Sequence, residues 1–162
     1  MAVDAEISRQ HIRQELASVE QLATSCHWEV LADYASLVVL VKMKACTGDP
    51  YIVEARCDDY KEVPPFFEFI DPETGLRGVQ RAYPKTSDSF FHTSGPCICA
   101  PFNRKAYKAV VATGPHSDWN FGDWQTSMAS NVPWANYSRL GDMFGLIHTR
   151  ISRSDLYKGR MG

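Results

Sequence analysis

Apolar positions recur with two different periods along the chain, and the change of period separates the predicted elements. Over residues 4–24, "DAEISRQHIRQELASVEQLAT", apolar residues return every three or four positions between charged and amide residues. This is the period of an amphipathic helix. Asp4 precedes the first apolar position, where a side-chain oxygen can cap a helix. The pattern predicts an N-terminal helix over about 4–24, with an apolar stripe formed by Ala5, Ile12, Leu16, Val19 and Ala23.

The chain then changes to short runs rich in β-branched and aromatic side chains, separated by turn residues. The runs are 28–31, 37–43, 51–57 and 66–70. "TGDP" separates the second run from the third, and the fourth lies between a Pro-Pro pair and "DPETG". Such runs with turn signals between them are typical of neighbouring antiparallel strands. We therefore predict a four-stranded antiparallel meander.

Regular patterning weakens over residues 76–101. Prolines and glycines interrupt a stretch that is otherwise rich in serine and threonine. Long segments without regular structure are uncommon in compact domains and often carry function. This segment is the candidate active-site loop.

A second helical pattern follows near the end of the chain, where Leu140, Met143, Phe144, Ile147 and Ile151 recur at helical spacing. Gly141 and Gly145 each lower helix propensity by about 1 kcal/mol relative to alanine, and we expect them to allow close packing on the sheet. The tail, about 155–162, is expected to fray. Together the patterns predict one α+β domain over residues 1–162, with an N-terminal helix, a meander, an active-site loop and a C-terminal helix.

Composition excludes several classes of function. The formal charge is -2, from 17 basic and 19 acidic residues, so no basic excess indicates a nucleic-acid partner. The longest aliphatic run, residues 37–41, is too short to cross a bilayer, and the first residues have no signal-peptide pattern. We expect a cytoplasmic protein that binds neither nucleic acid nor membrane.

Five cysteines are present, at Cys26, Cys46, Cys57, Cys97 and Cys99. An odd number without an export signal argues against a disulfide framework, so we expect reduced thiols. Each thiol is then a core residue, a metal ligand or a nucleophile.

The run "FFHTSGPCICAPFNRKAY" concentrates the candidate chemistry. In an extended chain Cys97 and Cys99 point to the same side, and a free thiol with a pKa near ~8.5 supplies some thiolate at neutral pH. His92 is the nearest side-chain donor, with Ser94 and Asn103 behind it. The alternative is that both cysteines are small buried hydrophobic residues.

Two further interpretations stay open. The set His92, Cys97, Cys99 and His116 offers four ligands of the types that zinc uses, although the Cys-x-Cys spacing is unusual. The aromatic residues Trp119, Phe121 and Trp124 could contact a partner, but we favour packing of this loop onto the sheet.

The segment "GDPYIVEARCDDYKEVPPFFEFIDPETG" resembles the middle of the ubiquitin-conjugating enzyme (UBC) fold. The matching positions there are Gly48, Pro50, Tyr51, Asp59, Tyr60, Pro64, Pro65 and Phe69, and the order continues with His92, Gly95, Ile98 and Cys99. The resemblance covers roughly residues 5–105 in the order of elements. Two departures stand out: His92-Thr93-Ser94 takes the place of the family's His-Pro-Asn triplet, and Ala100-Pro101 replaces the acidic-leucine pair after the cysteine.

The resemblance implies a UBC-like carrier without a cofactor or metal. Cys99 would accept a ubiquitin-like protein as a thioester from an ATP-using activating enzyme and transfer it to an amine of a protein target. Cys97 is the second candidate for the nucleophile. His92 would stabilise the charge that develops on the thioester oxygen.

The same resemblance leaves two alternatives open. One bacterial family of such relatives is described as a predicted metal-binding domain named for Cys-Glu-His-His. The ligands here would come from Cys57 or Cys99, Glu62 or Glu68, His92 and His116. The other alternative is a non-catalytic UBC-like module that docks a ubiquitin-like partner without forming a thioester.

Overall fold

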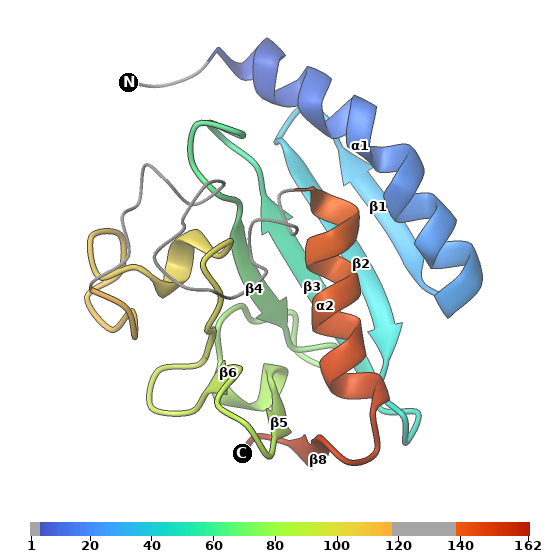
Figure 1. Cartoon of the computed structure of the whole chain (residues 1–162), viewed down its shortest axis with the longest axis vertical. Coiled ribbons are helices and arrows are strands. Elements are labelled where there is room, and N and C mark those ends of the chain that lie inside the picture. The colour runs from blue at the N-terminus through green and yellow to red at the C-terminus, as the bar shows by residue number, and fades with distance from the viewer. Residues whose placement is uncertain (1–3, 118–138) are drawn as a thin grey trace.

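The structure is a computed structural model that describes residues 4–117 and 139–162, and it has an α+β architecture (Figure 1). An N-terminal helix is followed by a four-stranded antiparallel sheet, an irregular region with short strands, and a C-terminal helix and strand. The elements are α1 (Ala5–Cys26), β1 (Glu29–Asp33), β2 (Val38–Lys44), β3 (Pro50–Arg56), β4 (Phe66–Ile70), the 3₁₀-helix η1 (Gln80–Ala82), β5 (Pro84–Thr86), β6 (Phe91–His92), β7 (Cys97–Ile98), the 3₁₀-helix η2 (Arg104–Ala106), α2 (Leu140–Ser152) and β8 (Tyr157–Arg160).

The predicted meander is confirmed. The sheet has the strand order β1-β2-β3-β4, and every neighbouring pair is antiparallel. Val41 of β2, Val53 of β3 and Phe69 of β4 are paired in register and are fully buried. Full burial of an aliphatic or aromatic side chain contributes about 1.5–3 kcal/mol. This row, together with its neighbours on the same face, forms the centre of the core.

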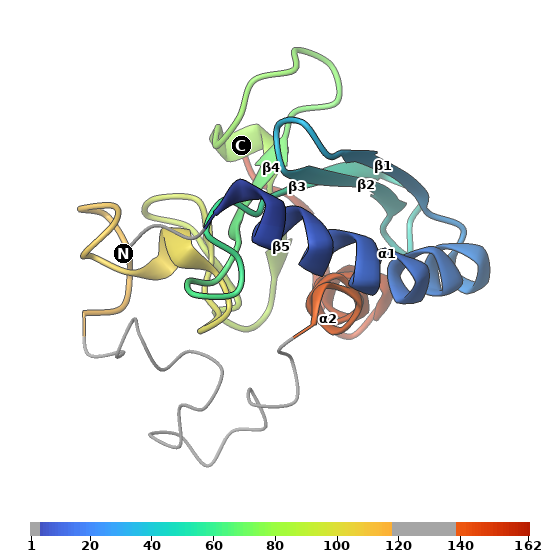
Figure 2. The same ribbon diagram turned by 90° about the horizontal axis from the view of Figure 1, so that it is seen from above.

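Both helices lie on the same face of the sheet and pack against each other (Figure 2). The strand β6 and the 3₁₀-helix η2 lie beyond β4, on the side away from β1, and β5 lies near the lower ends of β4 and α2 (Figure 1). The residues of the candidate active-site loop are therefore attached to the β4 edge of the sheet. None of the helices in the described parts of the chain has the length and apolar character required to cross a membrane.

Helix α1 confirms the predicted cap and most of the predicted stripe. The Asp4 carboxylate accepts a hydrogen bond from the Glu6 N–H at 2.7 Å. Ile12, Val19 and Ala23 are buried, whereas Ala5 at the first turn is exposed. The helix therefore packs against the core through the residues in the middle and at the end of its apolar stripe.

One charged residue of α1 is buried where the pattern predicted only apolar side chains. The Glu15 carboxylate accepts hydrogen bonds from the Tyr60 hydroxyl and from the Leu140 N–H, both at 2.8 Å, and pairs with Lys61 at 2.9 Å. The Leu140 N–H belongs to the first turn of α2, where N–H groups have no partner within the helix. Glu15 therefore joins α1 to the β3–β4 connection and to the start of α2.

The glycines of α2 have a different role from the one predicted. A Cβ added at Gly141 would lie 2.9 Å from the Ser18 Oγ, and one added at Gly145 would lie 3.8 Å from Leu22. Both neighbours belong to α1, so the expectation of close glycine packing on the sheet is wrong. The close approach is between the two helices.

The C-terminal tail is ordered, which corrects the expectation that residues 155–162 fray. Strand β8 pairs with β5, the Met161 N–H donates to the Tyr83 carbonyl at 2.9 Å, and Met161 is buried. The Tyr157 hydroxyl donates to Asp49 at 2.8 Å and shares a 2.7 Å hydrogen bond with the Tyr51 hydroxyl. Apolar burial and these hydrogen bonds hold residues 155–162 in place, although their many charged and glycine residues suggested a frayed end.

Candidate active site

The site begins at the hairpin formed by β6 and β7, two strands of two residues each. Phe91 pairs with Ile98, and both side chains are buried in the core. The Cys99 N–H donates to the Phe90 carbonyl at 2.7 Å, which extends the hairpin by one bond. The hairpin thus holds Cys99 at its end, where the thiol is half-buried.

Asn103 fastens this hairpin to the sheet. Its Oδ1 accepts from the Phe67 N–H at 2.9 Å and from the Lys105 N–H at 3.1 Å, and its Nδ2 donates to the Ile98 carbonyl at 2.9 Å. The side chain is fully buried. Because both ends of this amide are engaged, Asn103 is a structural residue and not the free donor considered from the sequence.

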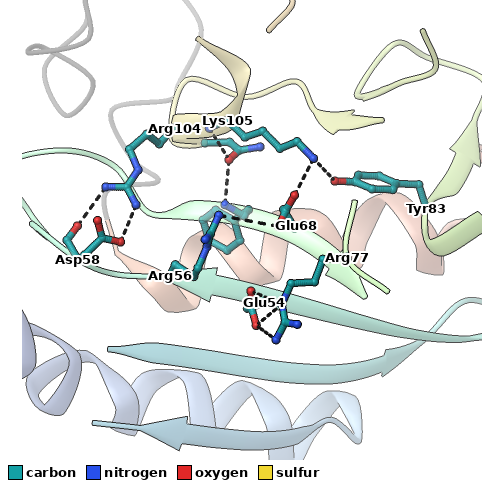
Figure 3. A network of polar contacts seen from close by, with 10 residues as sticks. Glu54, Arg56, Asp58, Glu68, Arg77, Tyr83, Arg104 and Lys105 are labelled. Carbon is teal, nitrogen blue, oxygen red and sulfur yellow. Dashed lines mark hydrogen bonds and ion pairs between the residues drawn. The ribbon is translucent and has the colours of Figure 1, made fainter. Parts of the chain in front are cut away.

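Two ion pairs hold η2 in place (Figure 3). Arg104 pairs with Asp58 of the β3–β4 connection at 2.7 Å, and Lys105 pairs with Glu68 of β4 at 2.8 Å. The Arg104 N–H also donates to the Pro65 carbonyl at 2.9 Å. The segment that follows the cysteines is therefore anchored to both ends of the same connection.

Backbone bonds place His116 beside the hairpin. The His116 N–H donates to the Ala106 carbonyl at 3.0 Å, and the Lys108 N–H donates to the His116 carbonyl at 3.1 Å. The Tyr107 hydroxyl in turn donates to the Pro101 carbonyl at 2.6 Å, close to Cys99. These contacts close the segment 108–115 into a loop. They bring His116 close to Cys99, although the two residues are far apart in the sequence.

The thiol of Cys99 is in direct contact with the imidazole of His116, and the distance from Sγ to Nε2 is 2.5 Å. Burial raises the pKa of the Cys99 thiol to about 11, so the thiol is protonated at neutral pH. A thiol in this state needs a base within hydrogen-bond reach to become a nucleophile. The His116 Nε2 lies within this reach and can act as the base in the tautomer that leaves it unprotonated.

Cys97 has a different environment although it lies only two positions away. It is buried against Ala106 and Tyr107, and burial raises its pKa to about 12. The Cys97 thiol donates to the Ile98 carbonyl at 3.4 Å and accepts from the Asn103 amide at 3.8 Å. Of the two candidates for the nucleophile, Cys99 has the base and the greater exposure.

His92 lies on β6, opposite Cys97 in the hairpin register. Its Nδ1 is buried and makes no hydrogen bond in the structure, and no hydrogen bond joins it to Cys99 in the described parts of the chain. Ser94, the other candidate donor, is exposed in the turn of the hairpin. The structure thus brings His116, and not His92, into contact with the Cys99 thiol.

The sequence contained little signal for this pairing. From the sequence, His116 is a candidate zinc ligand by residue type alone. It follows Cys99 by 17 positions and belongs to a turn-rich segment, so the pattern predicts no contact with the thiol. The turn residues in "TGPH" predict a change of chain direction but do not indicate where the His116 side chain points. The contact depends on the parallel bridge between Tyr107 and His116, which connects residues separated by the loop.

The zinc interpretation is not supported within residues 4–117 and 139–162. No three or more histidine, cysteine, aspartate or glutamate side chains come together there as a metal site requires. Neither the set with two cysteines nor the Cys-Glu-His-His set is therefore assembled among these residues. Trp119, Phe121 and Trp124, considered as partner contacts, lie outside the described residues.

Comparison with known protein families, with curated proteins and with solved structures finds no match for this chain. The geometry of the site and the residues around it are therefore the basis on which a function can be inferred.

Proposed function

We propose that the chain is a UBC-like carrier that accepts a ubiquitin-like protein on Cys99 as a thioester and transfers it to an amine of a protein target. The observation that carries the proposal is the 2.5 Å contact between the Cys99 Sγ and the His116 Nε2. The order of a helix, four antiparallel strands, a loop with the cysteine and a closing helix agrees with the resemblance on which the proposal depends.

The loading step uses the pair as nucleophile and base. His116 takes the proton of the Cys99 thiol as the sulfur attacks the carbonyl carbon of the incoming thioester. A bond forms between Sγ and that carbon, the bond to the donor's sulfur breaks, and the imidazolium returns the proton to the departing thiolate. The chain needs no cofactor for this exchange, because the ATP-using activating enzyme has already formed the activated acyl group.

His92 is proposed to stabilise the negative charge that develops on the carbonyl oxygen. The hairpin places it on the strand beside Cys97, and its Nδ1 is not committed to a structural hydrogen bond. A preorganised donor at such an oxygen typically contributes 10²–10³ in rate. The role requires the ring to reach the carbonyl of the bound acyl group.

A synthetic peptide that ends in Gly-Gly and carries a C-terminal thioester tests the carrier function without an activating enzyme. We expect one peptide adduct per chain, cleaved by excess thiol, and peptide mapping should locate it on Cys99. Cys99→Ser should give a thiol-resistant oxyester or no adduct. Cys97→Ser is the matched control and should load like the unchanged chain.

Three results would contradict the proposal. Loss of the adduct in Cys97→Ser alone would move the nucleophile to the buried thiol. Absence of any adduct on Cys99 would remove the carrier function. Full biological activity of Cys99→Ala would favour the non-catalytic binding module instead.

A further inference from the structure

We propose that His116 is also the catalytic base of the second half-reaction, in which it takes the proton of the amine that attacks the acyl group on Cys99. This inference depends on the proposed function in one respect, namely that Cys99 carries an acyl group. It adds a residue for acceptor activation, a role that neither the resemblance nor the motif around the cysteine assigns.

The geometry supports one base for both steps. In the acylated protein the carbonyl carbon is bonded to the Cys99 Sγ, the atom that lies 2.5 Å from the His116 Nε2. An acceptor nitrogen that attacks this carbon must approach the same small volume. A base that can reach the sulfur is then within one hydrogen bond of the attacking nitrogen.

The charged groups that hold η2 are engaged with one another. Asp58 pairs with Arg104, and Glu68 pairs with Lys105, in the contacts that hold η2 (Figure 3). Within the described residues no third titratable ligand-type side chain joins Cys99 and His116. Among these residues, His116 is the group in position to receive the acceptor's proton.

The position of His116 does not depend on the thiol. Its backbone is bonded to Ala106 and to Lys108, and both belong to the segment anchored by η2. Acylation of the thiol removes the hydrogen-bonding proton of Cys99 but leaves these backbone bonds intact. The backbone of His116 therefore stays beside the β6–β7 hairpin during the interval in which the acyl group waits for an acceptor.

The proton balance closes without another reactant. His116 takes one proton from the acceptor's ammonium group, and the neutral amine then attacks the thioester carbon, so that a nitrogen–carbon bond forms and the bond from carbon to Sγ breaks. The nitrogen gives its second proton to the departing Cys99 thiolate, and the imidazolium releases the first proton to solvent. The products are an amide and the free thiol, and His116 returns to its neutral form.

Acetyl transfer from p-nitrophenyl acetate tests this role separately from any recognition of a ubiquitin-like protein. The unchanged chain and His116→Gln are both acetylated on Cys99, the variant for longer and at alkaline pH, and then returned to neutral pH. Deacetylation is followed by intact mass with two acceptors. Nα-acetyl-lysine has a side-chain amine with a pKa of about 10.4 and must lose a proton, whereas hydroxylamine is largely unprotonated at neutral pH.

We expect His116→Gln to slow transfer to Nα-acetyl-lysine about 10²-fold or more, the usual contribution of a general base, and to leave transfer to hydroxylamine unchanged. His92→Gln is the comparison, because loss of an oxygen-stabilising donor should slow both acceptors to the same degree. Thermal unfolding of each variant establishes that it is folded.

The outcomes separate the two proposals. Equal rates with Nα-acetyl-lysine in the unchanged chain and in His116→Gln would overturn the role of His116 in the second step and leave the carrier function standing. Absence of acetyl groups on Cys99 in both proteins would overturn the nucleophile itself. Slowing of both acceptors by His116→Gln would show a role in positioning the thioester and would contradict the base assignment.

Discussion

At the scale of single residues, burial determines what each thiol in the described part of the chain can do. Burial raises the pKa of Cys57, Cys97 and Cys99, and the shift follows how deeply each is enclosed. Cys46 is exposed and has no comparable enclosure. The three buried or half-buried thiols therefore differ in acidity because their surroundings differ. Cys99 is distinguished from Cys57 and Cys97 by its contact with an imidazole.

The raised pKa of Cys97 predicts a loss of stability in alkali. The pKa of the Cys97 thiol is about 12 in the folded state, and its ordinary value is 9.0. Between these two values the Cys97 thiol is therefore ionised in the unfolded chain and neutral in the folded chain. Stability from the neutral buried thiol is complete below the ordinary value and is lost as pH rises through this window. Cys97→Ala should make the dependence on pH shallower by at most about 1.4 kcal/mol per pH unit.

Urea unfolding at a series of pH values measures this slope. Cys46→Ala removes an exposed thiol and is the control, because it should leave the slope as it is. An identical slope for Cys97→Ala and the unchanged chain would show that this thiol is not enclosed as described.

At the scale of elements, a few polar side chains connect segments that have little regular structure. Asn103 joins β7, η2 and β4, and Glu15 joins α1 to the start of α2. The strands could be predicted because alternation and turn residues mark them locally. These two polar connections could not be predicted, since their partners lie 36 and 125 positions away in the sequence.

Replacement of Asn103 by alanine tests how much the site depends on this connection. The change leaves the buried Phe67 N–H without its partner, and such an unsatisfied group costs about 1–3 kcal/mol. It also removes one hydrogen bond of the Ile98 carbonyl, which keeps its bond to the Ala100 N–H at 3.0 Å. We expect a lower free energy of unfolding and slower acetylation of Cys99 in the fraction that remains folded.

Urea unfolding and the p-nitrophenyl acetate assay measure the two effects. Ser89→Ala, at an exposed position in the same region, is the control. Stability and acetylation that match those of the unchanged chain would mean that the hairpin is held by other contacts.

At the scale of the whole molecule, two helices and one sheet face form a core from which the site region extends beyond β4 (Figure 1). The α+β class, the meander and the C-terminal helix follow from periodicity, which is a local property. The ordered tail and the helix–helix contact do not, because both depend on surfaces that meet only after folding. The same reason explains why the sequence indicated Cys99 but not its partner His116.

The helix–helix contact gives a prediction for the two glycines of α2. Gly141→Ala would place a Cβ 2.9 Å from the Ser18 Oγ, which is held by its own bond to the Glu15 carbonyl at 2.8 Å. Such overpacking typically costs about 1–3 kcal/mol. Gly145→Ala meets only an ordinary contact at 3.8 Å and should gain up to about 1 kcal/mol of helix propensity.

Thermal or urea unfolding of the two variants provides the comparison, with Gly145→Ala as the matched control. Ser18→Ala combined with Gly141→Ala should recover much of the loss, because it removes the atom that clashes. Stabilisation by Gly141→Ala alone would contradict the close approach of α1 and α2.

The pairing of β8 with β5 has a consequence for the order in which the protein matures during synthesis. The four-stranded sheet joins strands that are neighbours in the sequence, and all four strands have been synthesised by residue 70. Strand β5 precedes the β6–β7 hairpin that holds Cys99, yet its partner strand begins at Tyr157. A nascent chain can therefore expose Cys99 well before the strand that supports its neighbourhood has been made, and the thiol acquires its final surroundings late.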